Sequence, residues 1–327
     1  MKIPFLREGK RRYALVALVV AVSPIAPVHA VENGLPAAGN SYAVPIKTVL
    51  SPGNTGACSG VLIAPLTVVT AAHCVTDANG KLTADVYVGV AGNSLASITQ
   101  ANKVHSIELY SDFKIQAGLT VGNNDLAFLI LSHAQTLKAP IAIASEAQLA
   151  ALQVDGFPVT ITGYGYYSDT ATASSNFPES FTGSLSSSSA PNPNSAWVKS
   201  EGADACLGDS GSPVVSTING VVTVIGIVSG MDRSIDCTAK NSDGSYYTYF
   251  TLISRYQDLT LAARAASLLT VVEKGHPLSV QAKRATNTQI ASLKSQISQA
   301  QLHFGQNNRY LSNALQVLSV ATRKLRA

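Results

Sequence analysis

Three short motifs carry side chains that together could attack a carbonyl group. The run TAAHC contains His73, the run NNDLAFLIL contains Asp125, and GDSGSP frames Ser210 with two glycines and an aspartate. A serine hydroxyl becomes a nucleophile when an imidazole takes its proton and a carboxylate holds that imidazole in the correct tautomer. Taken singly, a histidine after an apolar run and an aspartate at a strand start are ordinary surface or turn residues. Together, in the order His, Asp, Ser, they indicate acyl transfer.

The motifs TAAHC, NDLAFL and GDSGSP resemble those of the chymotrypsin-like (trypsin-type) serine peptidases. The resemblance covers about residues 31–260. It implies an all-β fold of two six-stranded antiparallel β-barrels followed by a C-terminal helix. In that family the three catalytic side chains meet in the cleft between the barrels.

The resemblance also implies a role for each residue of the site. Ser210 is expected to be the nucleophile, His73 the general base and then acid, and Asp125 the carboxylate that orients the imidazole. The N–H groups of Gly208 and Ser210 are expected to form the oxyanion hole, and glycine tolerates the backbone conformation that this requires. Ser229 is expected to support Asp125.

Substrate preference is expected to depend on Asp204, which resembles the pocket-floor aspartate of trypsin-like members. A carboxylate there favours cleavage after Arg or Lys. Ser229 and Ser245 are expected to contribute to the same substrate-binding pocket. The sequence departs from the family pattern where Gly230 and Met231 stand in place of a usual tryptophan and its neighbour, and where Ser245 replaces a wall glycine.

The first thirty residues read as a signal peptide. A basic start is followed by the apolar run YALVALVVAV and by VHA, which ends at Ala30. The apolar run is too short for a stable membrane anchor and is followed by Pro24 and Pro27. We therefore expect a secreted or periplasmic protein, with a peptidase domain over 31–275 and a helical tail over 276–327.

Four cysteines, an even number, are consistent with two disulfides in an oxidising compartment. The spacings alone leave three pairings open, and no CxxC pattern indicates a metal site. The resemblance implies the pairs Cys58–Cys74 and Cys206–Cys237. No cofactor or metal is expected.

Asp209 stands beside the nucleophile, where a carboxylate buried alone would be costly. In the family it pairs with the α-amino group of the mature chain. Cleavage after Ala30 would expose Val31 in the run VENG. We therefore expect an ion pair between Val31 and Asp209, with the signal peptidase as the activating enzyme.

The pattern along the chain changes near residue 251. Before it, short apolar runs alternate with turn residues, which favours an all-β fold. Within this part, 168–195 is rich in Ser, Pro and Asn and is expected to be a surface loop. Residues 253–272 are expected to be helical, and from Leu278 a single long helix with a heptad seam is expected, weakened at Gly305.

Charge is divided unevenly between the body and the tail. Residues 31–275 carry a net charge of −7, and 276–327 carry seven basic and no acidic residues. The overall +4 therefore does not indicate a nucleic-acid partner. The tail is expected to dock on the peptidase domain, to contact another subunit or an anionic surface, or to be removed during secretion.

These features predict an exported serine endopeptidase that acts on polypeptides and cleaves after Arg or Lys. The alternative is a non-catalytic binding protein on the same fold. Such proteins usually lose a residue of the triad, whereas His73, Asp125 and Ser210 are all present here.

Overall fold

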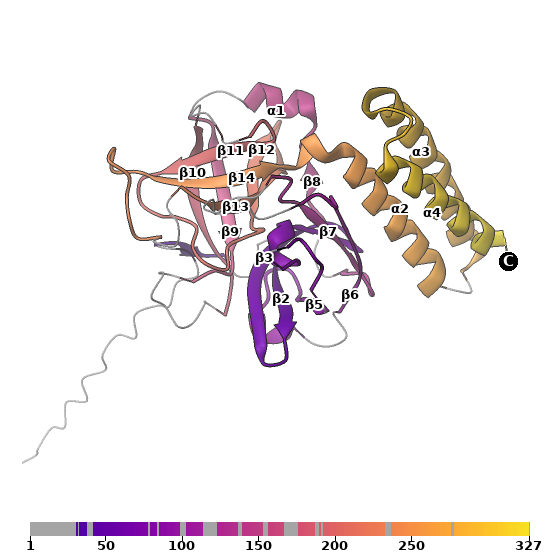
Figure 1. The fold of residues 1–327 in the computed structure, drawn as a ribbon, viewed down its shortest axis with the longest axis horizontal. Coiled ribbons are helices and arrows are strands. Elements are labelled where there is room, and N and C mark those ends of the chain that lie inside the picture. Colours follow the sequence, from indigo (N-terminus) through magenta and orange to yellow (C-terminus); the bar gives the residue numbers. More distant parts are fainter. Residues whose placement is uncertain are drawn as a thin grey trace, which may run out of the picture.

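The computed structural model describes residues 31–326 apart from 32, 38–41, 78, 84, 99–102, 114–122, 137–138, 153–155, 167–175, 187–189, 191, 233–236 and 276–277. The expected signal peptide, 1–30, lies outside these residues. Two β-barrels form the body, and three helices lie at one side of it (Figure 1).

The first barrel is a six-stranded antiparallel sheet in the order β5-β2-β3-β4-β7-β6. A bridge between Tyr87 and Lys103 links the two outer strands. The strands are β2 (Ala43–Ser51), β3 (Asn54–Ala64), β4 (Thr67–Thr70), β5 (Asp85–Val88), β6 (Val104–Leu109) and β7 (Ala127–Leu131).

The second barrel closes through a pairing of β9 with β10, giving the ring β10-β11-β14-β13-β12-β9. Two short strands, β1 (Leu35–Pro36) and β8 (Ala142–Ile143), attach to it, and β8 pairs in parallel with β13. The ring consists of β9 (Pro158–Gly163), β10 (Glu179–Ser186), β11 (Ser195–Ser200), β12 (Pro213–Ile218), β13 (Val221–Met231) and β14 (Tyr246–Leu252). The expected two six-stranded barrels are confirmed.

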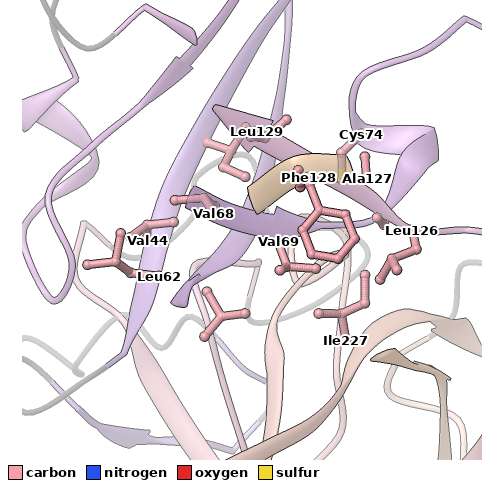
Figure 2. Packing of buried hydrophobic residues seen from close by; sticks show 14 of the residues in the cluster. Val44, Leu62, Val68, Val69, Cys74, Leu126, Ala127, Phe128, Leu129 and Ile227 are labelled. Atoms are coloured by element: carbon pink, nitrogen blue, oxygen red, sulfur yellow. The ribbon is translucent and has the colours of Figure 1, made fainter. Parts of the chain in front are cut away.

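One apolar core fills the first barrel and reaches the second. Figure 2 shows Val68 and Val69 of β4 beside Phe128 of β7, with Ile227 of β13 approaching from the second barrel. Every residue of β4 and β7 is buried, as expected for strands covered on both faces. The ends of these two strands therefore have a fixed position relative to the second barrel.

The helical part begins inside the peptidase region. After the short α1 (Glu146–Leu152), a 3₁₀ turn at Ile253–Tyr256 leads into α2 (Gln257–Lys274), which confirms the helix expected at 253–272. The tail forms α3 (Val280–Phe304) and α4 (Arg309–Arg326). Figure 1 shows α2, α3 and α4 side by side.

The single long helix expected in the tail is wrong. The chain reverses between α3 and α4, and Gly305 there adopts a φ of 90°, a conformation that favours glycine. The heptad seam instead becomes the core of a three-helix bundle, because Ile297 and Leu318 pack with Leu261 of α2. The tail thus lies on the peptidase body in this structure.

The surface loop expected over 168–195 is also wrong in part. Strand β10 occupies Glu179–Ser186, and it pairs with β9 and β11 in the wall of the second barrel. Phe181 and Leu185 are buried in that barrel's core. The serine-rich composition predicted a loop, although Phe181 and Leu185 lie on the same face of a strand.

Candidate active site

Two neighbouring strand ends place His73 beside Asp125. Thr70, the last residue of β4, pairs with Ala127, the first of β7. His73 follows β4 in a short 3₁₀ turn, and Asp125 lies just before β7. The imidazole Nδ1 is 2.7 Å from Asp125 Oδ2, and the His73 backbone N–H donates to Asp125 Oδ1 at 2.9 Å.

The charges of this pair stabilise each other. Burial opposes a charged imidazole, but the negative charge of Asp125 and its hydrogen bond outweigh this effect and raise the pKa of His73. Burial would raise the pKa of Asp125, but His73 and the hydrogen bond from Ser229 hold that pKa below its usual value. Ser229 Oγ donates to Asp125 Oδ2 at 2.5 Å. Asp125 is therefore held as a buried anion.

The loop that carries Ser210 is fixed to the first barrel by main-chain contacts. The backbone N–H of Ser59 in β3 donates to the Ser210 carbonyl at 2.9 Å. The Ser59 hydroxyl donates to the Gly208 carbonyl at 3.1 Å and accepts from the Tyr164 N–H at 2.9 Å. Ser59 was not among the residues expected from the sequence, since a serine in a strand has no distinctive local signal.

Two positions of this loop require glycine, because a Cβ would be unfavourable at each of them. Gly208 has a φ of 93°, and Gly211 has a φ of 82°. A Cβ on Gly211 would lie 2.2 Å from both the Ser59 carbonyl oxygen and the Thr70 hydroxyl. The loop could not approach the first barrel so closely with any other residue there.

His73 and Ser210 line one pocket of about 180 Å³. The other described residues of its wall are Ala205, Cys206, Leu207, Val228, Ser229, Gly230 and Met231. Ser229, which the resemblance places in the substrate-binding pocket, is one of these wall residues. Asp204 and Ser245 are buried, but neither is among the described lining residues.

Asp204 is engaged within the protein. Thr248 of β14 donates its hydroxyl to Asp204 Oδ1 at 2.6 Å, and the N–H of Ala205 donates to the same oxygen at 2.8 Å. The Arg or Lys preference expected from Asp204 therefore stays a prediction that these contacts do not favour.

Asp209 points away from the pocket into the second barrel. Its carboxylate accepts from the N–H groups of Gly165 and Cys206, both at 2.9 Å. Burial raises the pKa of Asp209 well above its usual value, and the negative charges of Asp204 and Glu179 add to this. The site is electrostatically suited to a cation.

Val31 lies near this carboxylate cluster. Its side chain is fully buried in the core of the second barrel, and its nitrogen is 3.5 Å from Glu179 Oε2. Glu179 pairs in register with Gly163, where a Cβ would meet Asp209 Oδ1. The pair expected between Val31 and Asp209 requires a chain that begins at Val31, so it stays a prediction.

Both disulfides implied by the resemblance are confirmed. Cys58 is bonded to Cys74 and Cys206 to Cys237, with Cα atoms 6.1 and 5.2 Å apart. Cys58, Cys74 and His73 lie close enough together to suggest a metal site. Their sulfurs are joined to each other, so they supply no thiolate ligand there.

Comparison with known proteins agrees with this arrangement. The family model described as Trypsin matches residues 33–260. The chain belongs to the trypsin family. It is 26% identical to Trypsin eta of Drosophila erecta over 53% of this chain and 70% of that protein. It is 28% identical to chymotrypsin-like elastase family member 1 of Rattus norvegicus, over 61% of this chain and 75% of that protein.

Another relative of this trypsin-family chain bears a name that states a loss of activity. The chain is 32% identical to the inactive CLIP domain-containing serine protease A3 of Aedes aegypti, over 64% of this chain and 48% of that protein. Membership of the trypsin family gives the chain a serine protease fold. Activity has to be argued from the site itself.

Proposed function

We propose that the chain is an exported serine endopeptidase that hydrolyses polypeptides through an acyl-enzyme on Ser210. The observation that carries this proposal is the series of hydrogen bonds in which Ser229 Oγ and His73 Nδ1 both donate to the carboxylate of Asp125. The series ends in the pocket that Ser210 lines. It supplies a base, a carboxylate that orients this base, and a hydroxyl nucleophile.

Hydrolysis proceeds in two halves. Ser210 Oγ attacks the carbonyl carbon while Nε2 of His73 takes the hydroxyl proton, and the N–H groups of Gly208 and Ser210 stabilise the oxyanion. His73 returns the proton to the amine as the C–N bond breaks, which leaves an ester on Ser210. Water, deprotonated by His73, then hydrolyses the ester and restores the serine.

Export and activation form the second part of the proposal. Signal cleavage after Ala30 gives a chain that begins at Val31, and the new ammonium group pairs with Asp209. The buried Val31 side chain and the raised pKa of Asp209 support this, because an ammonium group would stabilise the charged form of this buried carboxylate. The two disulfides fit an oxidising compartment. No helix among the described residues is long and apolar enough to cross a membrane.

The alternative is a binding protein without activity, and the relative that is named as inactive supports this alternative. Labelling with a fluorophosphonate distinguishes the two functions. The purified chain should bind one reagent per molecule at Ser210, located by mass spectrometry, and Ser210→Ala should bind none. A folded, secreted chain that begins at Val31 and does not react would contradict the proposed hydrolase.

The structure supports cleavage after Arg or Lys less strongly than it supports hydrolysis by Ser210. It rests on the position of Asp204 in the sequence, whereas the carboxylate is already bonded to Thr248 and Ala205. The contacts around the pocket lead to a different substrate class.

A further inference from the structure

The pocket beside Ser210 is small and mostly apolar. Its volume of about 180 Å³ is below the roughly 300–1,000 Å³ of sites that hold whole small ligands, so it suits one side chain. Val228, Leu207 and Met231 contribute apolar groups to its wall, and Cys206 contributes a disulfide sulfur. The remaining lining residues are His73, Ser210 and Ser229 of the proposed catalytic site, and Ala205 and Gly230, which have a methyl group or no side chain.

Two adjacent strands connect the pocket wall with the hydrogen-bond partner of Asp204. Met231 of β13 pairs in register with Thr248 of β14, after an irregularity between Val228 and Gly230. Met231 lines the pocket, while the buried Thr248 donates its hydroxyl to Asp204. Asp204 itself is 4% exposed. Met231 thus forms part of the pocket wall, while Thr248 and Asp204 bond to each other and are not among the described lining residues.

A lysine or arginine side chain in such a pocket would need a carboxylate within reach. Moving a cation from water into an apolar site without a counter-ion is strongly unfavourable. A cation that reached Asp204 would also have to share this buried carboxylate with the hydrogen bonds from Thr248 and the Ala205 N–H. An uncharged apolar side chain meets neither obstacle, and it fits the lining.

We propose that this pocket selects a small or medium-sized uncharged apolar side chain, such as that of Ala, Val or Leu, before the scissile bond. This inference rests on the proposed peptidase function. Asp204 then acts as an internal acceptor that holds Thr248 and the Ala205 backbone in place. Met231 and Thr248 are the residues that determine specificity.

A peptide panel tests this proposal. Peptides that differ only in Ala, Val, Leu, Phe, Lys or Arg before the scissile bond are incubated with the purified chain starting at Val31. The concentration of active enzyme is determined by fluorophosphonate titration of a separate aliquot. We expect kcat/KM for Ala, Val or Leu to exceed that for Lys and Arg by at least about tenfold. Higher values for Lys or Arg, or no cleavage in the panel by an enzyme that reacts with the fluorophosphonate, would overturn the proposed selectivity while leaving the nucleophile established. Failure to react would remove both proposals.

Variants locate the cause of the selectivity. The double variant Met231→Gly/Thr248→Gly removes the thioether from the pocket wall and the hydroxyl from Asp204, so the ratio of Arg to Ala cleavage should rise at least about tenfold. The matched variant Met231→Leu/Thr248→Ser keeps the side-chain volume and the hydroxyl, so its ratio should stay near that of the parent. If the double glycine variant reacts with the fluorophosphonate and its ratio does not change, Met231 and Thr248 do not determine specificity.

Discussion

Asp125 is the residue on which the chemistry of the site depends most directly. It is fully buried and accepts hydrogen bonds from His73 Nδ1, the His73 backbone and Ser229. Its charge raises the pKa of His73, so the imidazole becomes the neutral base only as the pH rises through that raised pKa. The value of kcat/KM should increase over the same pH range.

Replacement of this carboxylate gives the first prediction. Asp125→Asn removes the negative charge and the control of the tautomer, so kcat should fall by about 10⁴-fold, the loss typical of this change in a Ser-His-Asp triad. The pKa of His73 should also fall, which moves the rising part of the pH profile to lower pH. Imidazole NMR titration and a pH–rate profile measure these effects.

Asp112→Asn is the control for this change, because Asp112 is exposed and in the same barrel. It should leave both the rate and the pH profile near those of the parent. A pKa of His73 that did not change in Asp125→Asn would contradict the electrostatic account.

At the scale of elements, the serine loop meets the first barrel at a residue that has no side chain. Gly211 lies against the Ser59 carbonyl and the Thr70 hydroxyl. The Cys58–Cys74 disulfide joins β3 to the turn that carries His73. Barrel closure, disulfide and loop therefore determine together where the hydroxyl and the imidazole lie.

Gly211→Ala tests this contact. The new Cβ would overlap the first barrel, in addition to the left-handed backbone strain of about 1–3 kcal/mol. The variant should lose a further ~1–3 kcal/mol through overpacking, and its fluorophosphonate labelling should slow. Urea unfolding and the labelling rate provide the measurements.

Gly220→Ala is a matched control for Gly211→Ala. Gly220 has a φ of 78°, close to that of Gly211, but a Cβ there has no atom within 4 Å. It should show the backbone strain alone and label at the parental rate. Equal losses in the two variants would mean that the approach to the first barrel is unimportant.

The packing of the three-helix bundle gives a second prediction at the scale of elements. Ile297 of α3 is fully buried among α2, α3 and α4, whereas Leu302 of the same helix is 81% exposed. Ile297→Ala should cost about 2–5 kcal/mol of bundle stability, and Leu302→Ala should cost almost nothing. Thermal unfolding followed by circular dichroism compares them. Similar unfolding temperatures in the two variants would contradict the docked arrangement of the tail.

At the scale of the whole molecule, the tail and the body share polar contacts as well as the apolar core. Asp258 of α2 accepts from Tyr110 of the first barrel at 2.5 Å and from Asn308 of the tail at 2.8 Å. The Tyr310 hydroxyl accepts from the Ser111 backbone N–H at 3.0 Å. These bonds connect the turn between α3 and α4 to the barrel that carries His73 and Asp125.

The amino group that the proposed cleavage after Ala30 would create at Val31 provides the last prediction. With Val31 in peptide linkage, the pKa of Asp209 lies well above its value of about 3.9 in an unfolded chain. The folded state then binds this proton more tightly, so stability is lost as the pH rises through that interval. An ammonium group at Val31 would favour the charged carboxylate and remove the loss.

Thermal unfolding at pH 4 and pH 7 measures the difference. The Ser210→Ala variant is used to prevent self-digestion, and a chain starting at Val31 is compared with one carrying two extra N-terminal residues. The stability advantage of the chain that starts at Val31 should be larger at pH 7 than at pH 4. An advantage that did not change with pH would show that Asp209 is not the partner of the new terminus.

Local motifs made much of this architecture predictable. The apolar runs beside His73 and Asp125 became β4 and β7, and the disulfide pairs followed from the family resemblance. Strand β10 was missed because its buried Phe181 and Leu185 are separated by polar and small residues. The tail was predicted as helix correctly, but not its reversal at Gly305, because a heptad pattern is compatible with one long helix or with two that fold back.

The amino-acid order by itself determined the chemical groups of the site, the β-rich class and the helical tail, because these depend on local pattern and residue type. Only the tertiary structure decided that Ser59 holds the serine loop, that the tail packs on α2, and that Thr248 bonds Asp204. Each of these joins segments distant along the chain. Such contacts depend on strand register and helix packing, for which no short stretch of sequence carries a signal.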